Sequence, residues 1–125
     1  MIIEVRTRAH REMLNITSQV AAAIEDREDG LCHVYVPHTT AAVVINESAD
    51  PDVARDLIAA YEAMIPSISF AHAEGNSDAH LMATLLGSSV TVPIANGRLQ
   101  LGTWQGIFFV ELDGPRSRKV IVSRN

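Results

Sequence analysis

Three histidines are the residues most able to do chemistry in this sequence. His72 and His80 bracket the polar stretch "HAEGNSDAH", and His38 follows the apolar stretch "LCHVYVP". Three neutral imidazoles with a fourth position left open form a common type of catalytic zinc site. The spacing of His72 and His80 is not the i, i+4 spacing of one helix face, so the chain must fold back at Gly75 for their rings to meet. The alternative is that His38 only forms a hydrogen bond with Thr39, Thr40 or the backbone.

Acidic residues accompany these histidines. Glu74 and Asp78 lie before and within a predicted helix start, where the helix dipole stabilises carboxylates without any further function. The functional alternative is that one of them orients a ligating histidine or acts as a general base. Asn46 and Glu47 come at the end of the apolar run "AAVVINE", which would place both side chains at a strand end.

Two further stretches could bind a substrate. In "ELDGPRSRK", Asp113 precedes a sharp turn and Arg116 and Arg118 follow it, so the arginines either form ion pairs or clamp a phosphate or carboxylate. In "LGTWQGI", Trp104 and Gln105 lie between two glycines at a strand junction. They either cover a hairpin or line a pocket.

The elements that must position these residues alternate in type. Strands are expected at residues 1–7, 31–36, 41–47, 88–94, 98–104, 106–112 and 119–123, with Asn96-Gly97 as a hairpin turn. A helix is expected within 16–30, with Thr17 as its N-cap and Gly30 at its end. A second is expected from Asp50 to Pro66, and a third from about Ser77 to Gly87.

This pattern predicts a single compact domain over residues 1–125. Its class is α+β, with a mixed, mostly antiparallel sheet or sandwich and about three helices. The formal net charge of −5 disfavours nucleic acid as a partner, and no apolar run is long enough to span a membrane. The N-terminus lacks a secretory signal, and the lone Cys32 lies in an apolar strand. A cytoplasmic location is expected.

The whole chain resembles the bacterial and archaeal YjbQ-type family, also labelled secondary thiamine-phosphate synthase. The resemblance rests on "HTTAAVVINE", "HAEGNSDAHLMATLLGSS", "LGTWQGIFFVELDGPR" and "RKVIV", in that order. It implies a homotrimer whose shared histidines and acidic residues lie near a metal or ligand site. The family motifs fall on His38, Thr39, Asn46, Glu47, His72, Glu74, Asp78, His80, Trp104, Gln105, Asp113 and Arg116.

The activity that the resemblance implies joins hydroxymethylpyrimidine pyrophosphate to thiazole phosphate with loss of pyrophosphate. We expect a small phosphorylated substrate, Glu47, Glu74, Asp78 and Arg116 as catalytic residues, and the three histidines as metal ligands. Thr39, Asn46, Trp104, Gln105, Asp113 and Arg118 would bind substrate. Imidazoles favour zinc, whereas magnesium would prefer carboxylate and substrate oxygens. The alternatives are a zinc-dependent hydrolase and a trimeric module that binds a metal or ligand without catalysis.

Overall fold

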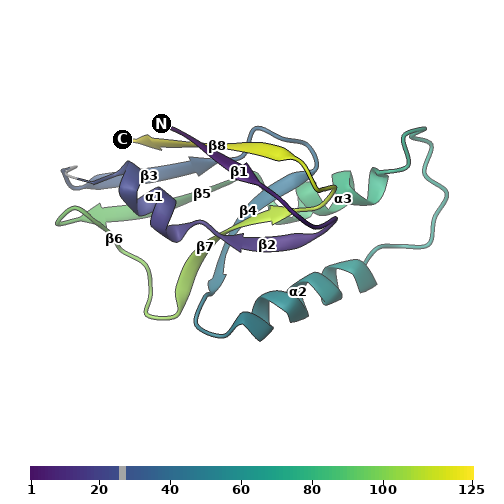
Figure 1. Ribbon diagram of the computed structural model, residues 1–125, viewed down its shortest axis with the longest axis horizontal. Coiled ribbons are helices and arrows are strands. Elements are labelled where there is room, and N and C mark those ends of the chain that lie inside the picture. Colours follow the sequence, from purple (N-terminus) through teal and green to yellow (C-terminus); the bar gives the residue numbers. More distant parts are fainter. Residues whose placement is uncertain (26–27) are drawn as a thin grey trace.

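The computed structural model describes residues 1–25 and 28–125 and contains two β-sheets with helices on one of them (Figure 1). The eight strands of the described part are β1 (Ile2–Arg6), β2 (Glu12–Asn15), β3 (Gly30–Tyr35), β4 (Ala41–Glu47), β5 (Ser89–Ala95), β6 (Arg98–Leu99), β7 (Gln105–Glu111) and β8 (Ser117–Arg124). The helices are α1 (Thr17–Ala23), α2 (Pro51–Ala63) and α3 (Ser77–Leu86). The predicted α+β class is confirmed.

The two sheets differ in size. One has the strand order β1-β8-β3-β5-β6 and the other the order β2-β7-β4. Every strand pair of the described residues is antiparallel. The strands β4 and β7 are paired over their full length, from Ala41 opposite Glu111 to Glu47 opposite Gln105. This pairing fixes both ends of β4 relative to β7.

The main core lies between the sheets and beneath α1. Alternate residues of β7 explain the layering, since successive side chains of a strand point to opposite faces. Ile107 and Phe109 contribute to the core between the sheets, where both are fully buried. Val110 faces the other way and packs in a second cluster with Ala79 and Met82 of α3. The helices α2 and α3 therefore cover the outer face of the small sheet.

Local signals set the ends of the longer helices as predicted. The Asp50 carboxylate accepts a hydrogen bond from the Asp52 backbone at 2.9 Å, and Pro51 opens α2. Gly87, with φ of 98°, ends α3 in a conformation that side chains disfavour. The Asn96-Gly97 turn joins β5 to β6 with positive φ at both residues.

Other local predictions are wrong. The first helix does not reach Gly30: α1 ends at Ala23, residues 26–27 lie outside the described residues, and Gly30 already belongs to β3. Gly30 is required there for space, since a Cβ atom would lie 2.5 Å from the Asn125 carbonyl oxygen. Thr17 is the first helical residue and not the cap; its backbone N–H donates to the Asn15 side chain at 3.0 Å.

Two strands also differ from the prediction. β2 was not expected, because "EMLN" lacks the β-branched residues that mark a strand. Pairing with the long strand β7, from Glu12 opposite Glu111 to Asn15 opposite Phe108, stabilises it. β6 has only two residues instead of the seven expected at 98–104, and the segment after it crosses to the small sheet.

Candidate active site at the start of helix α3

Helix α3 brings two of the three histidines together. His80 lies in its first half, held by the packing of Ala79 and Met82 against the small sheet. His72 lies in the segment before the helix, which folds back at Gly75 with φ of 79°. The ring centroids of His72 and His80 are 5.4 Å apart, and the rings are nearly perpendicular at 87°. The predicted turn at Gly75, which brings the rings of His72 and His80 together, is therefore present.

Two cavities of about 380 Å³ each flank this histidine pair. His80 lines the first, together with His38 and Thr39 from the connection between β3 and β4. His72 lines the second, together with Asp78 and Gly75. His38 and His80 therefore share a cavity although they belong to different segments.

His38 is held as a neutral imidazole. Its Nε2 atom accepts a hydrogen bond from the Lys119 backbone N–H at 2.9 Å. Burial lowers the pKa of His38 below its ordinary value, and the positive charge of Arg118 lowers it further. A neutral ring that accepts at Nε2 carries its proton on Nδ1, so neither nitrogen offers a free lone pair in this arrangement.

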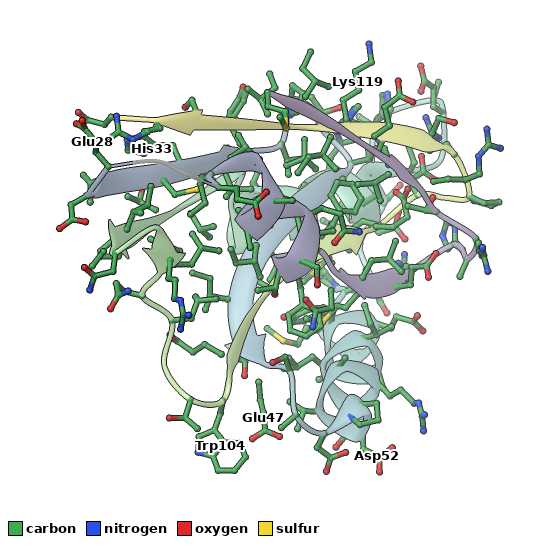
Figure 2. All side chains as sticks on the ribbon, turned by 60° about the vertical axis from the view of Figure 1, so that its left-hand side comes forward. Glu28, His33, Glu47, Asp52, Trp104 and Lys119 are labelled. Carbon is green, nitrogen blue, oxygen red and sulfur yellow. The ribbon has the colours of Figure 1, made fainter. Side chains whose placement is uncertain are left out.

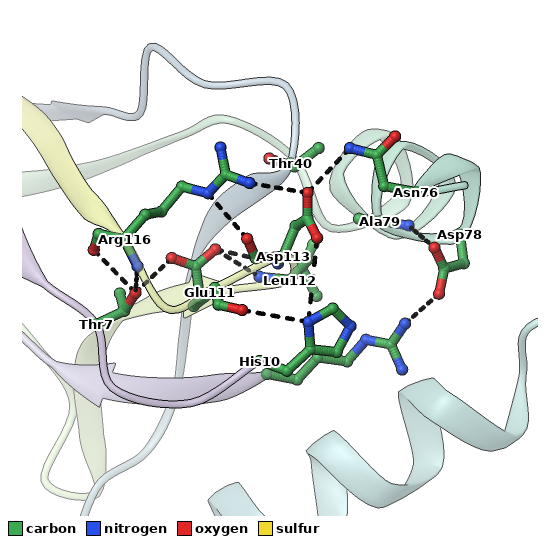
Figure 3. A network of polar contacts seen from close by, with 12 residues as sticks. Thr7, His10, Thr40, Asn76, Asp78, Ala79, Glu111, Leu112, Asp113 and Arg116 are labelled. Carbon is green, nitrogen blue, oxygen red and sulfur yellow. Dashed lines mark hydrogen bonds and ion pairs between the residues drawn. The ribbon is translucent and has the colours of Figure 1, made fainter. Parts of the chain in front are cut away.

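An acidic and basic cluster lies next to the start of α3 (Figure 3). The Asp113 carboxylate accepts hydrogen bonds from the Asn76 amide at 2.9 Å and from the Arg116 guanidinium at 3.1 Å. Arg116 also donates to the Asp113 carbonyl oxygen at 2.9 Å. The Asn76 Oδ1 atom is buried without a hydrogen-bond partner in the described residues. The side chain of Arg116 is half exposed, so it can still meet an anion from solvent.

His10 belongs to this cluster and was not predicted. Its Nδ1 atom lies 3.3 Å from the Gly114 carbonyl oxygen and 4.0 Å from the Asp113 carboxylate (Figure 3). Donation from Nδ1 would leave Nε2 as a free base on an exposed ring. The sequence offers no signal for this contact, because His10 precedes Asp113 by 103 residues. The pairing of β2 with β7, which places Glu12 opposite Glu111, brings them together, and the pairing of β1 with β8 closes the other side.

The predicted acidic residues of "HAEGNSDAH" have different environments. Asp78 forms an ion pair with Arg11, which also approaches Glu62 of α2 at 3.8 Å. The Arg11 Nε atom is buried without a partner in the described residues. Asp78 thus ties α3 to the segment before β2, whereas Glu74 lies exposed in the turn before the helix.

Arg118, predicted to bind substrate, faces the protein interior. Its guanidinium forms an ion pair with Glu111 and donates to the Thr40 carbonyl oxygen at 3.1 Å, and both charged side chains are almost completely buried. Burial alone would raise the pKa of Glu111, but hydrogen bonds from Arg118 and Thr7 outweigh it and lower that pKa below its ordinary value. This placement makes Arg118 a support for the site wall near His38.

Four of the predicted residues lie at the other end of the small sheet. Asn46 and Glu47 end β4, and Glu47 is paired with Gln105 at the start of β7, next to Trp104. Glu47 lies six positions after Ala41 along β4, a distance of about 20 Å at the usual rise. Figure 2 shows Glu47 and Trp104 together at one end of the molecule and Lys119 at the opposite end. A single chain does not bring these residues to the histidines.

The three predicted metal ligands do not converge as a set. Within residues 1–25 and 28–125, no group of three His, Cys, Asp or Glu side chains is arranged to hold a metal ion. His72 and His80 could supply two imidazoles, but His38 is engaged by Lys119. The three-histidine ligand set therefore stays a prediction, in which His72 and His80 are the two members whose rings are in contact.

The described part of the chain contains no helix that is long and apolar enough to cross a membrane.

Together, fold and site define a small two-sheet α+β domain with a histidine pair and an Asp-Arg cluster at the start of its third helix. The chain belongs to the family described as UPF0047 protein YjbQ-like, which it matches over residues 1–125. The predicted family resemblance is confirmed.

Relatives and solved structures agree with this assignment. The chain is 47% identical to a UPF0047 protein of Methanocaldococcus jannaschii, over 95% of this chain and 88% of that protein. It is 42% identical to UPF0047 protein YugU of Bacillus subtilis, over 93% of this chain and 91% of that one. A crystal structure of a YjbQ/UPF0047 family protein from Clostridium acetobutylicum has a TM-score of 0.96 at 44% identity, covering 100% of this chain and 99% of that chain.

Proposed function

We propose that this protein is an enzyme that acts on a small phosphorylated metabolite at the start of α3. The observation that supports this most is the meeting of His38 and His80 in one cavity, with His72 against His80 and Arg116 nearby on the Asp113 cluster. Such a set provides groups that can bind a phosphate and groups that can exchange protons. The proposed reaction is of the thiamine-phosphate synthase type.

The chemistry of that reaction places demands on the site. A carbon–nitrogen bond forms to the thiazole phosphate while the carbon–oxygen bond to pyrophosphate breaks, and the bonding electrons leave with pyrophosphate. Positive charge must stabilise the leaving group. Arg116 supplies a half-exposed guanidinium, oriented by Asp113. In our proposal His80 donates a hydrogen bond or a proton to a phosphate oxygen, and His72 orients His80.

A divalent metal is a separate part of the proposal. Bound to His72 and His80, with substrate oxygens as further ligands, a zinc ion would supply additional neutralisation of phosphate charge. Metal analysis of protein purified without a tag tests this, because His80→Ala is expected to lower the metal content. Equal metal content in both proteins would contradict metal binding at His80. The imidazoles would then act only as acid, base and phosphate-binding groups.

Formation of thiamine phosphate from the two substrates tests the enzymatic proposal. His80→Ala and Arg116→Ala are expected to reduce the rate by roughly a hundredfold or more, the usual effect of losing a proton donor or a charge-stabilising group. His33→Ala is the matched control, since His33 lies on β3 and bonds to Thr91 away from these cavities. Equal rates in all variants would contradict the proposal. Thermal stabilisation by the substrates without turnover would instead support a ligand-binding module.

We also propose that the chain assembles as a homotrimer, as the family resemblance implies. Its support is exposed apolar surface: the side chains of Met1, Ile2, Met64 and Trp104 are all more than half exposed. Light scattering after size-exclusion chromatography measures the mass directly. A mass of one 13.6 kDa chain at micromolar concentration would contradict the trimer.

A further inference from the structure

One cavity of the described residues lies away from the histidines His38, His72 and His80. It has a volume of about 490 Å³, within the range of small-molecule sites. The first half of α2 forms one wall, and β2 and the end of β4 form the other. We call it the α2 cavity. None of the three histidines lines it.

The floor of the α2 cavity is apolar. Phe108 of β7 and Met13 of β2 face α2 across the outer side of the small sheet, and Ile58 and Ala54 of α2 close the other side. Such a floor favours a ligand with an aromatic or aliphatic body, because contact with it removes apolar surface from water.

The charges around the cavity are unbalanced. Its walls carry three carboxylates, on Glu12, Glu47 and Asp50, and two guanidiniums, on Arg11 and Arg55. Both guanidiniums are neutralised by carboxylates that do not line the cavity. Arg11 pairs with Asp78 and Glu62, and Arg55 pairs with Asp52 at 2.8 Å.

The three wall carboxylates are less committed. Glu12 uses one oxygen, Oε2, to accept from the backbone of Arg8 and Ala9 at 2.6 and 2.9 Å, and Asp50 uses Oδ1 to cap α2. The half-buried Glu47 makes no side-chain hydrogen bond or ion pair within residues 1–25 and 28–125. Within the described part of the chain, an apolar floor beneath a carboxylate without a partner, Glu47, and two carboxylates with one oxygen free is complementary to a cation with an apolar body.

We propose that the α2 cavity binds a small organic cation, in which an ammonium or amidinium group contacts Glu47 and an aromatic or aliphatic body lies on Phe108 and Met13. This site is independent of the proposed reaction at α3. It assigns to Glu47 a binding role at the opposite end of the small sheet from the histidines.

Three probes with the same body and different charge test the proposal: phenethylammonium, phenethyl alcohol and hydrocinnamate. Methionine-methyl NMR of the full chain reports the location, because Met13 lines the cavity while Met82 of α3 is buried against the small sheet. Phenethylammonium is expected to shift the Met13 signal and leave Met82 unchanged, with affinity roughly tenfold or more above that of the other two probes.

Two variants locate the contact. Glu47→Gln is expected to reduce the affinity for phenethylammonium roughly tenfold and to leave the weak affinity for phenethyl alcohol unchanged. Ala54→Phe fills the cavity and is expected to abolish the Met13 shift. Glu4→Gln, an exposed carboxylate on β1, is the matched control. Equal binding of all three probes, no shift at Met13, or an unchanged affinity in Glu47→Gln would overturn the proposal.

Discussion

At the scale of single residues, the buried pair of Glu111 and Arg118 fixes the wall behind the histidine cavity. Glu111 would be a costly isolated charge between the sheets, and Arg118, Thr7 and backbone N–H groups satisfy it. The same guanidinium holds Thr40 and lowers the pKa of the nearby His38. Arg118 thus contributes both to the stability of the buried pair and, after burial, to the depressed pKa of His38.

Replacing Arg118 should show this dependence. Arg118→Met leaves Glu111 buried without its partner and is expected to lower the free energy of unfolding by about 3 to 5 kcal/mol. Urea unfolding followed by circular dichroism measures the loss. Restoring neutrality with Glu111→Leu in the same chain should recover much of it, and Arg98→Met, at an exposed residue of β6, serves as the control. A loss of unfolding free energy in Arg118→Met no larger than in Arg98→Met would contradict the stabilising role of the Glu111–Arg118 pair.

His38 predicts a specific pH dependence of stability. Because its pKa is lower in the folded than in the unfolded chain, the unfolded chain binds more protons once the pH falls below about 6.5. The stabilising effect is complete above that pH and is lost as the pH falls towards the folded pKa. The depressed pKa of Glu111 acts separately, below its ordinary value of 4.5.

Unfolding free energies measured from about pH 7.5 down to pH 5 test this prediction. His38→Gln keeps an acceptor for the Lys119 N–H but cannot titrate. The slope of its unfolding free energy against pH should therefore be smaller than that of the natural chain. His33→Gln should keep the natural slope. A slope that His38→Gln does not change would show that other groups cause it.

At the scale of elements, local chemistry predicts the helices better than the strands. Asp50 and Pro51 mark the start of α2, and Gly87 marks the end of α3, because caps act within a few residues. β2 escapes prediction because its stability comes from pairing with β7, which is distant in sequence. The misplaced end at Gly30 has the same origin: that glycine makes room for the C-terminal residue Asn125.

Helix α2 offers a direct test at this scale. No residue of α2 is fully buried, so its cap should matter more than usual to local stability. Asp50→Ala is expected to lower the free energy of unfolding by about 1 kcal/mol and to speed amide exchange in the first turn. Asp56→Ala, an exposed position within the same helix, is the control. Equal exchange rates in the two variants would argue against a capping role.

At the scale of the whole molecule, the predicted site residues separate into two groups. The sequence indicates that His38, His72 and His80 are chemically suited to one site, and the turn at Gly75 makes the meeting of the last two predictable. Which end of β4 each residue occupies also follows from the sequence. Their separation from Trp104 and Gln105 does not, because it depends on the antiparallel pairing of β4 with β7. His10 is missed because its approach to Asp113 depends on the pairing of β2 with β7, which are distant in the sequence.

The central claim is that the start of α3 binds a phosphorylated small molecule, and calorimetric titration with inorganic pyrophosphate tests it most directly. The natural protein and His33→Ala should bind equally, while Arg116→Ala and His80→Ala should bind roughly tenfold more weakly or worse, since each loses a charge-assisted contact. Binding with the same affinity in all four proteins, or no binding in the natural protein, would contradict the account.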